Sequence, residues 1–204
     1  MSYRDFTLSD IEKQFTLTID ETTDLYSSVR EMPISDSLKA ILDEQVPLAL
    51  AISTEKARSE LIIAPLLVEL RKMVNHQISL FSGVDFTVDS SRGLSGVCDF
   101  IVSGSRKQFV LDAPVLIIIE AKNESIPSGL GQCVAQMIAA QLFNEHQGNP
   151  IKTVHGAVTT GSVWRFLRLR ETTLWIDCLE YYINTVGRIL AILLSIVESK
   201  ESIS

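Results

Sequence analysis

The 204-residue sequence has few of the residues that build a disulfide or zinc scaffold. Its three cysteines, Cys98, Cys133 and Cys178, form no CxxC pair, and an odd number cannot all pair within one chain. Its three histidines form neither HxxxH nor HExxH, so the zinc sites with those spacings are excluded. This cysteine usage is typical of a reduced, intracellular protein, and we expect a cytoplasmic location.

Signals for secretion, membrane insertion and nucleotide cradles are also missing. Residues 1–15 contain no apolar stretch of the kind found in signal peptides. The longest apolar stretch, Ile189–Val197, is too short to cross a bilayer, which needs about 20 residues. Neither GxxxxGK[ST] nor GxGxxG occurs, so phosphate-binding loops of those types are excluded. We therefore expect no membrane association.

The chain also lacks a net positive charge. The chain has 18 basic and 25 acidic residues, a net charge of −7, which argues against coating nucleic acid through overall charge. The acidity is concentrated in residues 1–54, with 4 basic and 10 acidic side chains, whereas residues 55–178 carry 12 of each. Any contact with a polyanion must therefore come from the middle of the chain.

The hydrophobic fraction of 46% is enough for a sizeable core, and the length fits one domain. Hydrophobic periodicity predicts a first helix from Ser9, a helix over Asp36–Ile52 capped by Asp36, and a helix from Ser53 or Thr54 to Val74. Two further helices are predicted over Ser128–Gln147 and Tyr181–Glu198. The predicted strands are Ile78–Val88, Leu94–Ser103, Pro114–Ala121, Thr153–Thr160, Ser162–Arg170 and Thr173–Asp177.

This order predicts an α/β (α+β) domain over residues 55–204, with a central mixed sheet flanked by helices and a C-terminal helix. Residues 1–54 are expected to form an acidic helical arm that packs on this domain. Within Pro114–Ala121, the run Val115–Ile119 is apolar at every position, which is typical of a central strand covered on both faces.

Three polar residues interrupt or end the predicted strands. Asp99 lies in the otherwise apolar strand Val97–Val102, and a buried charge needs a cation, a metal or a strong hydrogen bond. Glu120 and Lys122 end the central strand and share one face by the two-residue period. On the preceding helix, Glu60 is expected on the core-facing stripe, whereas Glu69 is expected on the opposite side, in water.

Each of these residues alone has an ordinary structural explanation. The pattern ExK occurs a second time, at Glu198-Ser199-Lys200 in the tail, so it carries little information by itself. A strand-end glutamate or lysine is commonly a solvated edge residue. The informative feature is the joint order: a helix acid, a strand aspartate, ExK at the end of an apolar strand, and then a helix.

That order resembles the PD-(D/E)XK nuclease superfamily, whose core is the restriction-endonuclease-like fold. The resemblance covers Ser53 to Arg170, with Asp99 preceded by Cys98 where the name-giving pattern has proline. Glu120-Ala121-Lys122 stands for the (D/E)xK element. Glu60 stands for the helix acid of the family. Some branches add a helix glutamine followed four residues later by tyrosine; here Gln132 matches, but the later position is Gln136.

The resemblance implies a Mg²⁺-dependent (or Mn²⁺-dependent) phosphodiester hydrolase acting on DNA. Asp99, Glu120 and the carbonyl of Ala121 would hold the ion, since carboxylate and carbonyl oxygens suit Mg²⁺. Glu60 would hold a second ion or a metal-bound water. Lys122 would orient the attacking water or stabilise developing charge, and Gln132 would position phosphate or water.

Other interpretations remain open. A catalytically inactive protein of the same fold could act as a binding or regulatory partner, and the acidic net charge favours this mildly. A small-molecule hydrolase on another α/β fold lacks a nucleophile elbow. Leu190–Val197 could pack under the sheet or form a homodimer contact, and Arg165, Arg168 and Arg170 could touch phosphates or line an exposed sheet face.

Overall fold

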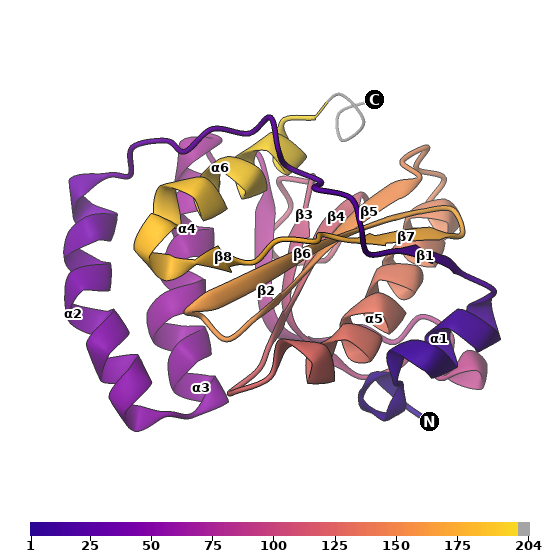
Figure 1. Ribbon diagram of the computed structural model, residues 1–204. Coiled ribbons are helices and arrows are strands. Elements are labelled where there is room, and N and C mark those ends of the chain that lie inside the picture. Colours follow the sequence, from indigo (N-terminus) through magenta and orange to yellow (C-terminus); the bar gives the residue numbers. More distant parts are fainter. Residues whose placement is uncertain (200–204) are drawn as a thin grey trace.

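The computed structural model describes residues 1–199, in which a mixed sheet separates two layers of helices (Figure 1). The helices are α1 (Leu8–Phe15), α2 (Asp36–Ile52), α3 (Glu55–Arg58), α4 (Ala64–Met73), α5 (Ile126–His146) and α6 (Val186–Val197). α2, α4 and α6 lie on one side of the sheet, and α1 and α5 lie on the other (Figure 1). The predicted α/β class, with helices flanking a mixed sheet, is confirmed.

The sheet order is β1-β7-β6-β5-β4-β3-β2, and β8 also pairs with β6. The strands are β1 (Thr18–Asp20), β2 (Ser79–Asp85), β3 (Val97–Ser103), β4 (Val115–Ala121), β5 (Thr153–Thr159), β6 (Val163–Arg170), β7 (Thr173–Ile176) and β8 (Tyr181–Tyr182). β4 and β5 run parallel, with α5 as the connection between them, and β1 runs parallel to β7. Parallel strands need such a crossover connection. Because β4 and β5 run in the same direction, their carboxyl ends lie at the same edge of the sheet.

β4 lies inside the sheet, as its apolar sequence predicts, and every residue in it is buried. Ile117 and Ile119 join the core between the sheet and α2, α4 and α6, whereas Ile118 joins the core under α5. A polar side chain at the end of this strand is therefore surrounded by apolar groups and must find its partners locally.

α5 approaches the sheet closely because two of its residues are glycines. A Cβ atom on Gly129 would lie 2.7 Å from Val158 Cγ1 and 3.0 Å from Lys122 Cγ, too close for any side chain. A Cβ atom on Gly131 would lie 2.3 Å from the carbonyl oxygen of Phe6. The helix begins at Ile126, two residues before the predicted start. Gly129 lets the sheet pack closely against it, and Gly131 does the same for the N-terminal segment.

Residues 1–54 contribute to both the sheet and the helical layers. β1, a strand that the sequence did not predict, pairs with the predicted strand β7, and α2 buries Leu38, Leu42 and Ala49. The N-cap of α2 is Ser35, whose hydroxyl accepts a hydrogen bond from the Leu38 amide; the prediction that Asp36 is the cap was wrong by one residue. The domain boundary at residue 54 stays a prediction.

The helix after Thr54 is interrupted by a π turn at Ser59–Ile63, between α3 and α4. A π turn takes more residues than an α turn, so it rotates the preceding residues relative to the stripe of α4. Glu60, within the π turn, is therefore exposed, which is the reverse of its prediction. The prediction that Glu69 lies in water was also wrong: the buried face of α4 is wider than the predicted stripe and includes Glu69 beside Leu66 and Leu70.

The C-terminal helix also begins later than predicted. α6 starts at Val186, because Tyr181 and Tyr182 instead form β8 and pair with Trp164 and Val163. Ile189 to Leu193 are buried in the core of the same chain, so the apolar stretch packs against the sheet, one of the two uses predicted for it. Within residues 1–199, no helix has the length and apolar character to cross a membrane.

His155 on β5 anchors the segment between β1 and α2. Its Nδ1 atom lies 3.1 Å from the hydroxyl of Tyr26, and Arg168 is its cross-strand neighbour on β6. Burial of the imidazole, together with the positive charge of Arg168, lowers the pKa of His155 to about 3. The folded protein therefore keeps this histidine neutral where a free histidine would be charged.

We predict that His155 makes the protein sensitive to acid. Between pH 6.5 and about 3 the unfolded chain binds a proton at His155 that the folded chain does not, so the free energy of unfolding falls as the pH drops through this range. H155Q should lose less thermal stability than the wild type between pH 7 and pH 4. Thermal unfolding followed by circular dichroism measures this, with H146Q at an exposed helix end as the control; equal pH profiles for H155Q and the wild type would contradict it.

Candidate active site

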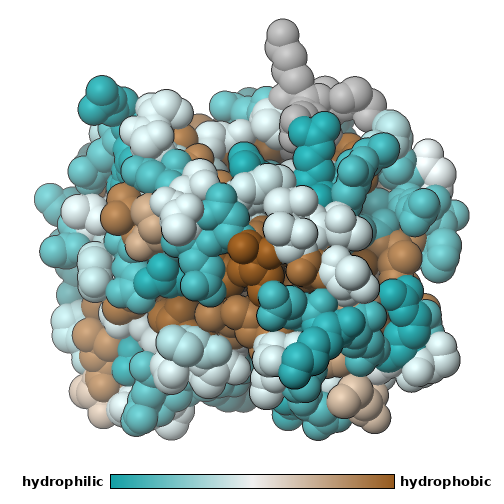
Figure 2. Space-filling model, turned by 45° about the vertical axis from the view of Figure 1, so that its right-hand side comes forward, coloured by the Kyte–Doolittle hydropathy of each residue, from teal (hydrophilic) through white to brown (hydrophobic). Residues whose placement is uncertain are grey.

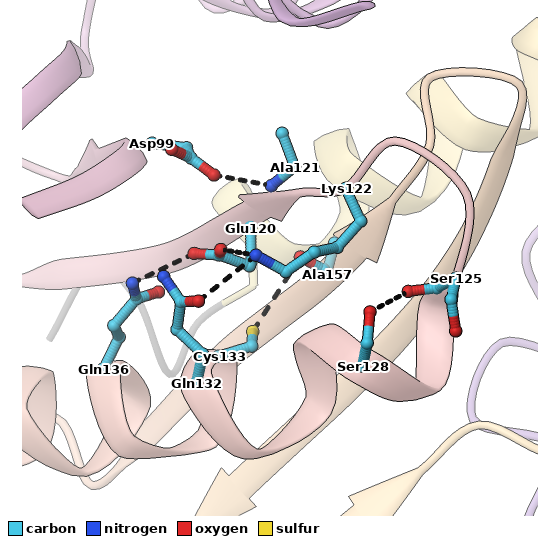
Figure 3. A network of polar contacts seen from close by, with 10 residues as sticks. All are labelled: Asp99, Glu120, Ala121, Lys122, Ser125, Ser128, Gln132, Cys133, Gln136 and Ala157. Atoms are coloured by element: carbon cyan, nitrogen blue, oxygen red, sulfur yellow. Dashed lines mark hydrogen bonds and ion pairs between the residues drawn. The ribbon is translucent and has the colours of Figure 1, made fainter. Parts of the chain in front are cut away.

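Asp99 and Glu120 lie on neighbouring antiparallel strands, near the carboxyl end of β4. Phe100 pairs with Ile119 in the β3–β4 register, which places Asp99 beside Glu120. Asp99 Oδ2 accepts a hydrogen bond of 2.8 Å from the backbone amide of Ala121 (Figure 3). The two carboxylates predicted to act together are therefore held at one edge of the sheet.

The Glu120 carboxylate is 1% exposed and is bonded on both oxygens (Figure 3). Oε1 forms an ion pair with Lys122 Nζ, and Oε2 accepts a hydrogen bond of 3.0 Å from Gln136 Nε2. Lys122 Nζ also donates to Gln132 Oε1 at 3.2 Å. Gln132 and Gln136, four residues apart on α5, thus reach the sheet from the same helix face.

Gln136 is a site residue that the sequence interpretation missed. The signal was present, because Gln132 and Gln136 have the i, i+4 spacing of one helix face. Gln136 is fully buried, and its Oε1 has no hydrogen-bond partner among residues 1–199. An unpartnered buried oxygen is costly, so the network around Glu120 is not fully satisfied by the protein itself.

The electrostatics of the network centre on Glu120. Its pKa is raised to about 7, first by burial and then by the negative charge of Asp99, against the opposing effect of Lys122 and its hydrogen bonds. The upward shift means that desolvation and like-charge repulsion outweigh the attraction of the lysine. A carboxylate in this state favours either a proton or an additional cation.

Two buried thiols, Cys98 and Cys133, lie close to Glu120 in the same hydrophobic core. Burial raises the pKa of Cys98 on β3 and of Cys133 on α5, and the charge of Glu120 raises both further. Cys133 Sγ lies 3.8 Å from the carbonyl oxygen of Ala157. These thiols therefore stay protonated and pack around the polar network as small apolar groups.

Arg58, the last residue of α3, brings a positive charge to the same edge of the sheet. The half-buried Arg58 donates from Nε to Asn123 Oδ1 at 3.2 Å and from one terminal nitrogen to the Thr160 carbonyl at 2.8 Å. Asn123 directly follows Lys122. Sequence periodicity could not identify Arg58, because the contact depends on how the helix meets the loops after β4 and β5.

Glu60 does not join the two strand carboxylates. Its side chain is 63% exposed and lies 3.7 Å from Lys56 in an i, i+4 ion pair. Among residues 1–199, no three side chains of the histidine, cysteine, aspartate and glutamate types are grouped to hold a metal ion. The structure therefore brings together Asp99, Glu120, Ala121, Lys122 and Gln132, but not Glu60.

The chemistry of the remaining donors fits a hard divalent cation. Asp99 is close enough for its charge to raise the pKa of Glu120, and Gln136 Oε1 is a buried oxygen without a hydrogen-bond partner in the part of the chain that the structure describes. Carboxylate and carbonyl oxygens with room for several waters are the usual ligands of Mg²⁺. The two thiols, being protonated, do not favour a soft metal.

The arginines of β6 are engaged in other contacts. Arg165 donates to the Asp177 carbonyl and to Glu180, and Arg168 stacks over Trp175 at 4.5 Å from the ring centroid. The register places Arg165 in the same row as Glu120, two strands away across Val158, with its guanidinium held by Asp177 and Glu180. A phosphate contact from Arg165 stays a prediction.

Comparisons with known proteins identify no relative of this chain: no family model, curated protein or solved structure matches it. The interpretation of the site depends on its own geometry.

We predict that Glu120 lowers stability at alkaline pH when no metal is added. Its folded pKa of about 7 exceeds the ordinary 4.5, so the stability that it contributes is complete below pH 4.5 and is lost as the pH rises through 7. The free energy of unfolding of E120Q, measured relative to that of the wild type, should therefore rise by roughly 2 kcal/mol between pH 5 and pH 8.

Thermal unfolding of both proteins at pH 5 and pH 8 measures this difference, and for a chain of this size the gain corresponds to roughly 5 °C. E171Q changes an exposed glutamate and serves as the control. An E120Q variant that loses more stability at pH 8 than at pH 5 would show that the pair with Lys122 outweighs burial.

Proposed function

We propose that the protein is a Mg²⁺-dependent phosphodiester hydrolase acting on DNA, built on a core of the PD-(D/E)XK type. The observation that carries the proposal is the contact of Lys122 with Glu120 at the end of a buried strand, with Asp99 beside them. Carboxylates and a lysine so arranged combine the groups that phosphodiester hydrolysis requires. The order helix, three strands, helix and strand supports the same proposal.

Asp99, Glu120 and the carbonyl of Ala121 would hold the divalent ion. When bound, Mg²⁺ supplies charge neutralisation for the phosphate and lowers the pKa of a coordinated water. The upward-shifted pKa of Glu120 is consistent with a carboxylate that lacks such a cation.

Lys122 would act on the reacting phosphate. Its ammonium is oriented by Glu120 and Gln132, and its aliphatic stem packs where Gly129 leaves room. A fixed ammonium stabilises negative charge that develops in the transition state without having to reorganise. Arg58 adds a second positive charge at the same edge of the sheet.

The alternative is an inactive nuclease-like protein that binds or regulates a partner. The observation in its favour is the burial of Glu120, whose two oxygens are already bonded by Lys122 and Gln136. In that case the network would serve only to join β4 to α5. Metal binding distinguishes the two functions, because a purely structural network has no need of an added ion.

We predict that D99A and K122A abolish DNA cleavage for different reasons. D99A should remove Mn²⁺ binding, since the ion loses one of two carboxylate ligands. K122A should bind Mn²⁺ as well as the wild type or slightly better, because a competing charge is gone, yet lose activity by on the order of 10² or more. Cleavage of single-stranded, double-stranded and branched DNA, together with calorimetric Mn²⁺ titration, measures both effects.

E60A and K56A are the matched controls, because both side chains are exposed and form an ion pair with each other. Both variants should cut and bind Mn²⁺ like the wild type. A wild-type protein that binds no Mn²⁺ and cuts none of the substrates would favour the inactive alternative. Undiminished cutting by K122A would remove Lys122 from the catalytic machinery.

A further inference from the structure

Arg58 carries a positive charge that no carboxylate of the described chain balances. Its side chain is half-buried at the end of α3, and among residues 1–199 it forms no ion pair. Its two bonds go to uncharged oxygens, from Nε to Asn123 Oδ1 at 3.2 Å and from Nη1 to the Thr160 carbonyl at 2.8 Å. Because a partly buried charge is normally compensated by an opposite one, this guanidinium has the capacity to bind an anion.

The two bonds fix the direction of the guanidinium and leave part of it unused. They involve Nε and Nη1, whereas the other terminal nitrogen, Nη2, donates to no acceptor in the described part of the chain. The planar fork of an arginine matches the oxygens of a phosphate group. Since the orientation of Arg58 is already set by its two bonds, little side-chain entropy is lost when an anion binds to it.

Both partners of Arg58 are direct neighbours of the candidate active site. Asn123 follows Lys122 in the chain. Thr160 follows Thr159, whose carbonyl accepts a hydrogen bond of 2.8 Å from the backbone amide of Lys122. In Figure 1, α3 lies beside the chain that leads from β4 to α5. The guanidinium therefore lies one residue beyond the Lys122–Thr159 pair, at the carboxyl ends of β4 and β5.

Lys122 and Arg58 reach the end of β4 from different sides of the sheet. The ammonium of Lys122 is bonded to Glu120 and to Gln132 on α5. Arg58 belongs to α3, which leads through the π turn into α4 in the other helical layer (Figure 1). A nucleic-acid strand that crosses this edge of the sheet would therefore meet the two cations at two different phosphates.

The overall character of the protein does not attract a polyanion. The chain has a net charge of −7. On the face drawn in Figure 2, apolar residues form a band across the middle, with hydrophilic residues around it. General electrostatic attraction to DNA is therefore weak, and affinity must come from a few cations held in fixed positions.

We propose that Arg58 binds a phosphate next to the one that is cleaved, so that the substrate is a polynucleotide strand and not a small phosphodiester. This inference rests on the proposed hydrolase function and adds to it the residue that selects the substrate class. A contact with a phosphate that does not react is equally strong in the bound substrate and in the transition state. Such a contact lowers KM and leaves kcat unchanged.

Steady-state cleavage of a DNA oligonucleotide with a single cleavage site, over a range of NaCl concentrations, tests the proposal. R58Q should raise KM by about tenfold or more, as expected for the loss of a charged hydrogen bond, with little change in kcat. The magnitude of the slope of log KM against log salt concentration should fall by about 0.7 to 0.9, the contribution of one phosphate contact. Calorimetric titration should give R58Q the Mn²⁺ affinity of the wild type, because Arg58 bonds to none of the proposed metal ligands.

K56Q is the matched control, because it removes the same charge from an exposed lysine of the same helix. Lys56 is paired with Glu60, away from the two bonds that orient Arg58. K56Q should therefore keep the KM and the salt slope of the wild type.

A chemical change in the DNA identifies the phosphate that Arg58 contacts. Uncharged methylphosphonates replace the phosphates around the cleaved bond one at a time. At the contacted position the replacement should raise KM for the wild type but not further for R58Q, because that interaction is already lost. R58K keeps the charge without the planar fork, so it should raise KM less than R58Q and retain the salt slope of the wild type. A purely structural role for Arg58 would not single out one phosphate.

Unchanged KM and salt slope in R58Q would overturn the proposal, as would a fall in kcat at constant KM. Methylphosphonate effects that are equal in R58Q and the wild type at every position would also overturn it. If R58Q does not fold, R58K carries the test, and an R58K variant with the KM of the wild type would refute the contact through the fork. Failure of the proposed function is distinguishable, because a wild type that binds no Mn²⁺ and cuts no DNA would refute the hydrolase itself, and this inference with it.

Discussion

The burial of the Glu120–Lys122 ion pair is the constraint on which the surrounding structure depends. The pair lies at the end of a strand that is buried on both faces, where removing two charges from water costs several kcal/mol per ion by rough estimates. The fold offsets this cost with Gln132 and Gln136 from α5, which bond the lysine and the carboxylate. The position of α5 against the sheet is therefore set by polar chemistry as well as by apolar packing.

The placement of α5 in turn links the site to the N-terminus. Gly129 allows the helix to close over Lys122, and Gly131 allows the backbone of Phe6 to close over the helix from the other side. The turn at Tyr3–Asp5 and the helix α1 pack against α5 and thus hold it from outside, while β1 adds to the sheet next to β7. Residues that carry most of the acidic charge of the chain stabilise the site through packing, while the balanced middle of the chain provides its chemistry.

Predictability from the sequence followed the regularity of the local structure. The continuous apolar run predicted β4 and its central place, and the two-residue period placed Glu120 and Lys122 on one face. The prediction that Glu60 lies on the core-facing side of its helix was wrong, because the π turn at Ser59–Ile63 changes which residues face the core, and the amino-acid composition gives no sign of such a turn. β1 and β8 were not predicted, because they are very short and form through pairing with strands distant in the sequence. Arg58 was not predicted as a site residue, because its partners Asn123 and Thr160 belong to loops distant in the sequence.

The charge of the candidate site bears directly on the substrate proposed for it. Asp99, Glu120 and Lys122 together carry a net negative charge when both carboxylates are ionised, and burial makes this state unfavourable. A phosphodiester adds further negative charge, which the cations that the structure places at this edge, Lys122 and Arg58, offset only in part because Lys122 is already paired. A divalent ion between the carboxylates and the phosphate would resolve both the intramolecular repulsion and the repulsion of the substrate. Under the proposed function, the same electrostatics that raise the pKa of Glu120 would make the binding of an anionic substrate depend on the binding of a metal ion.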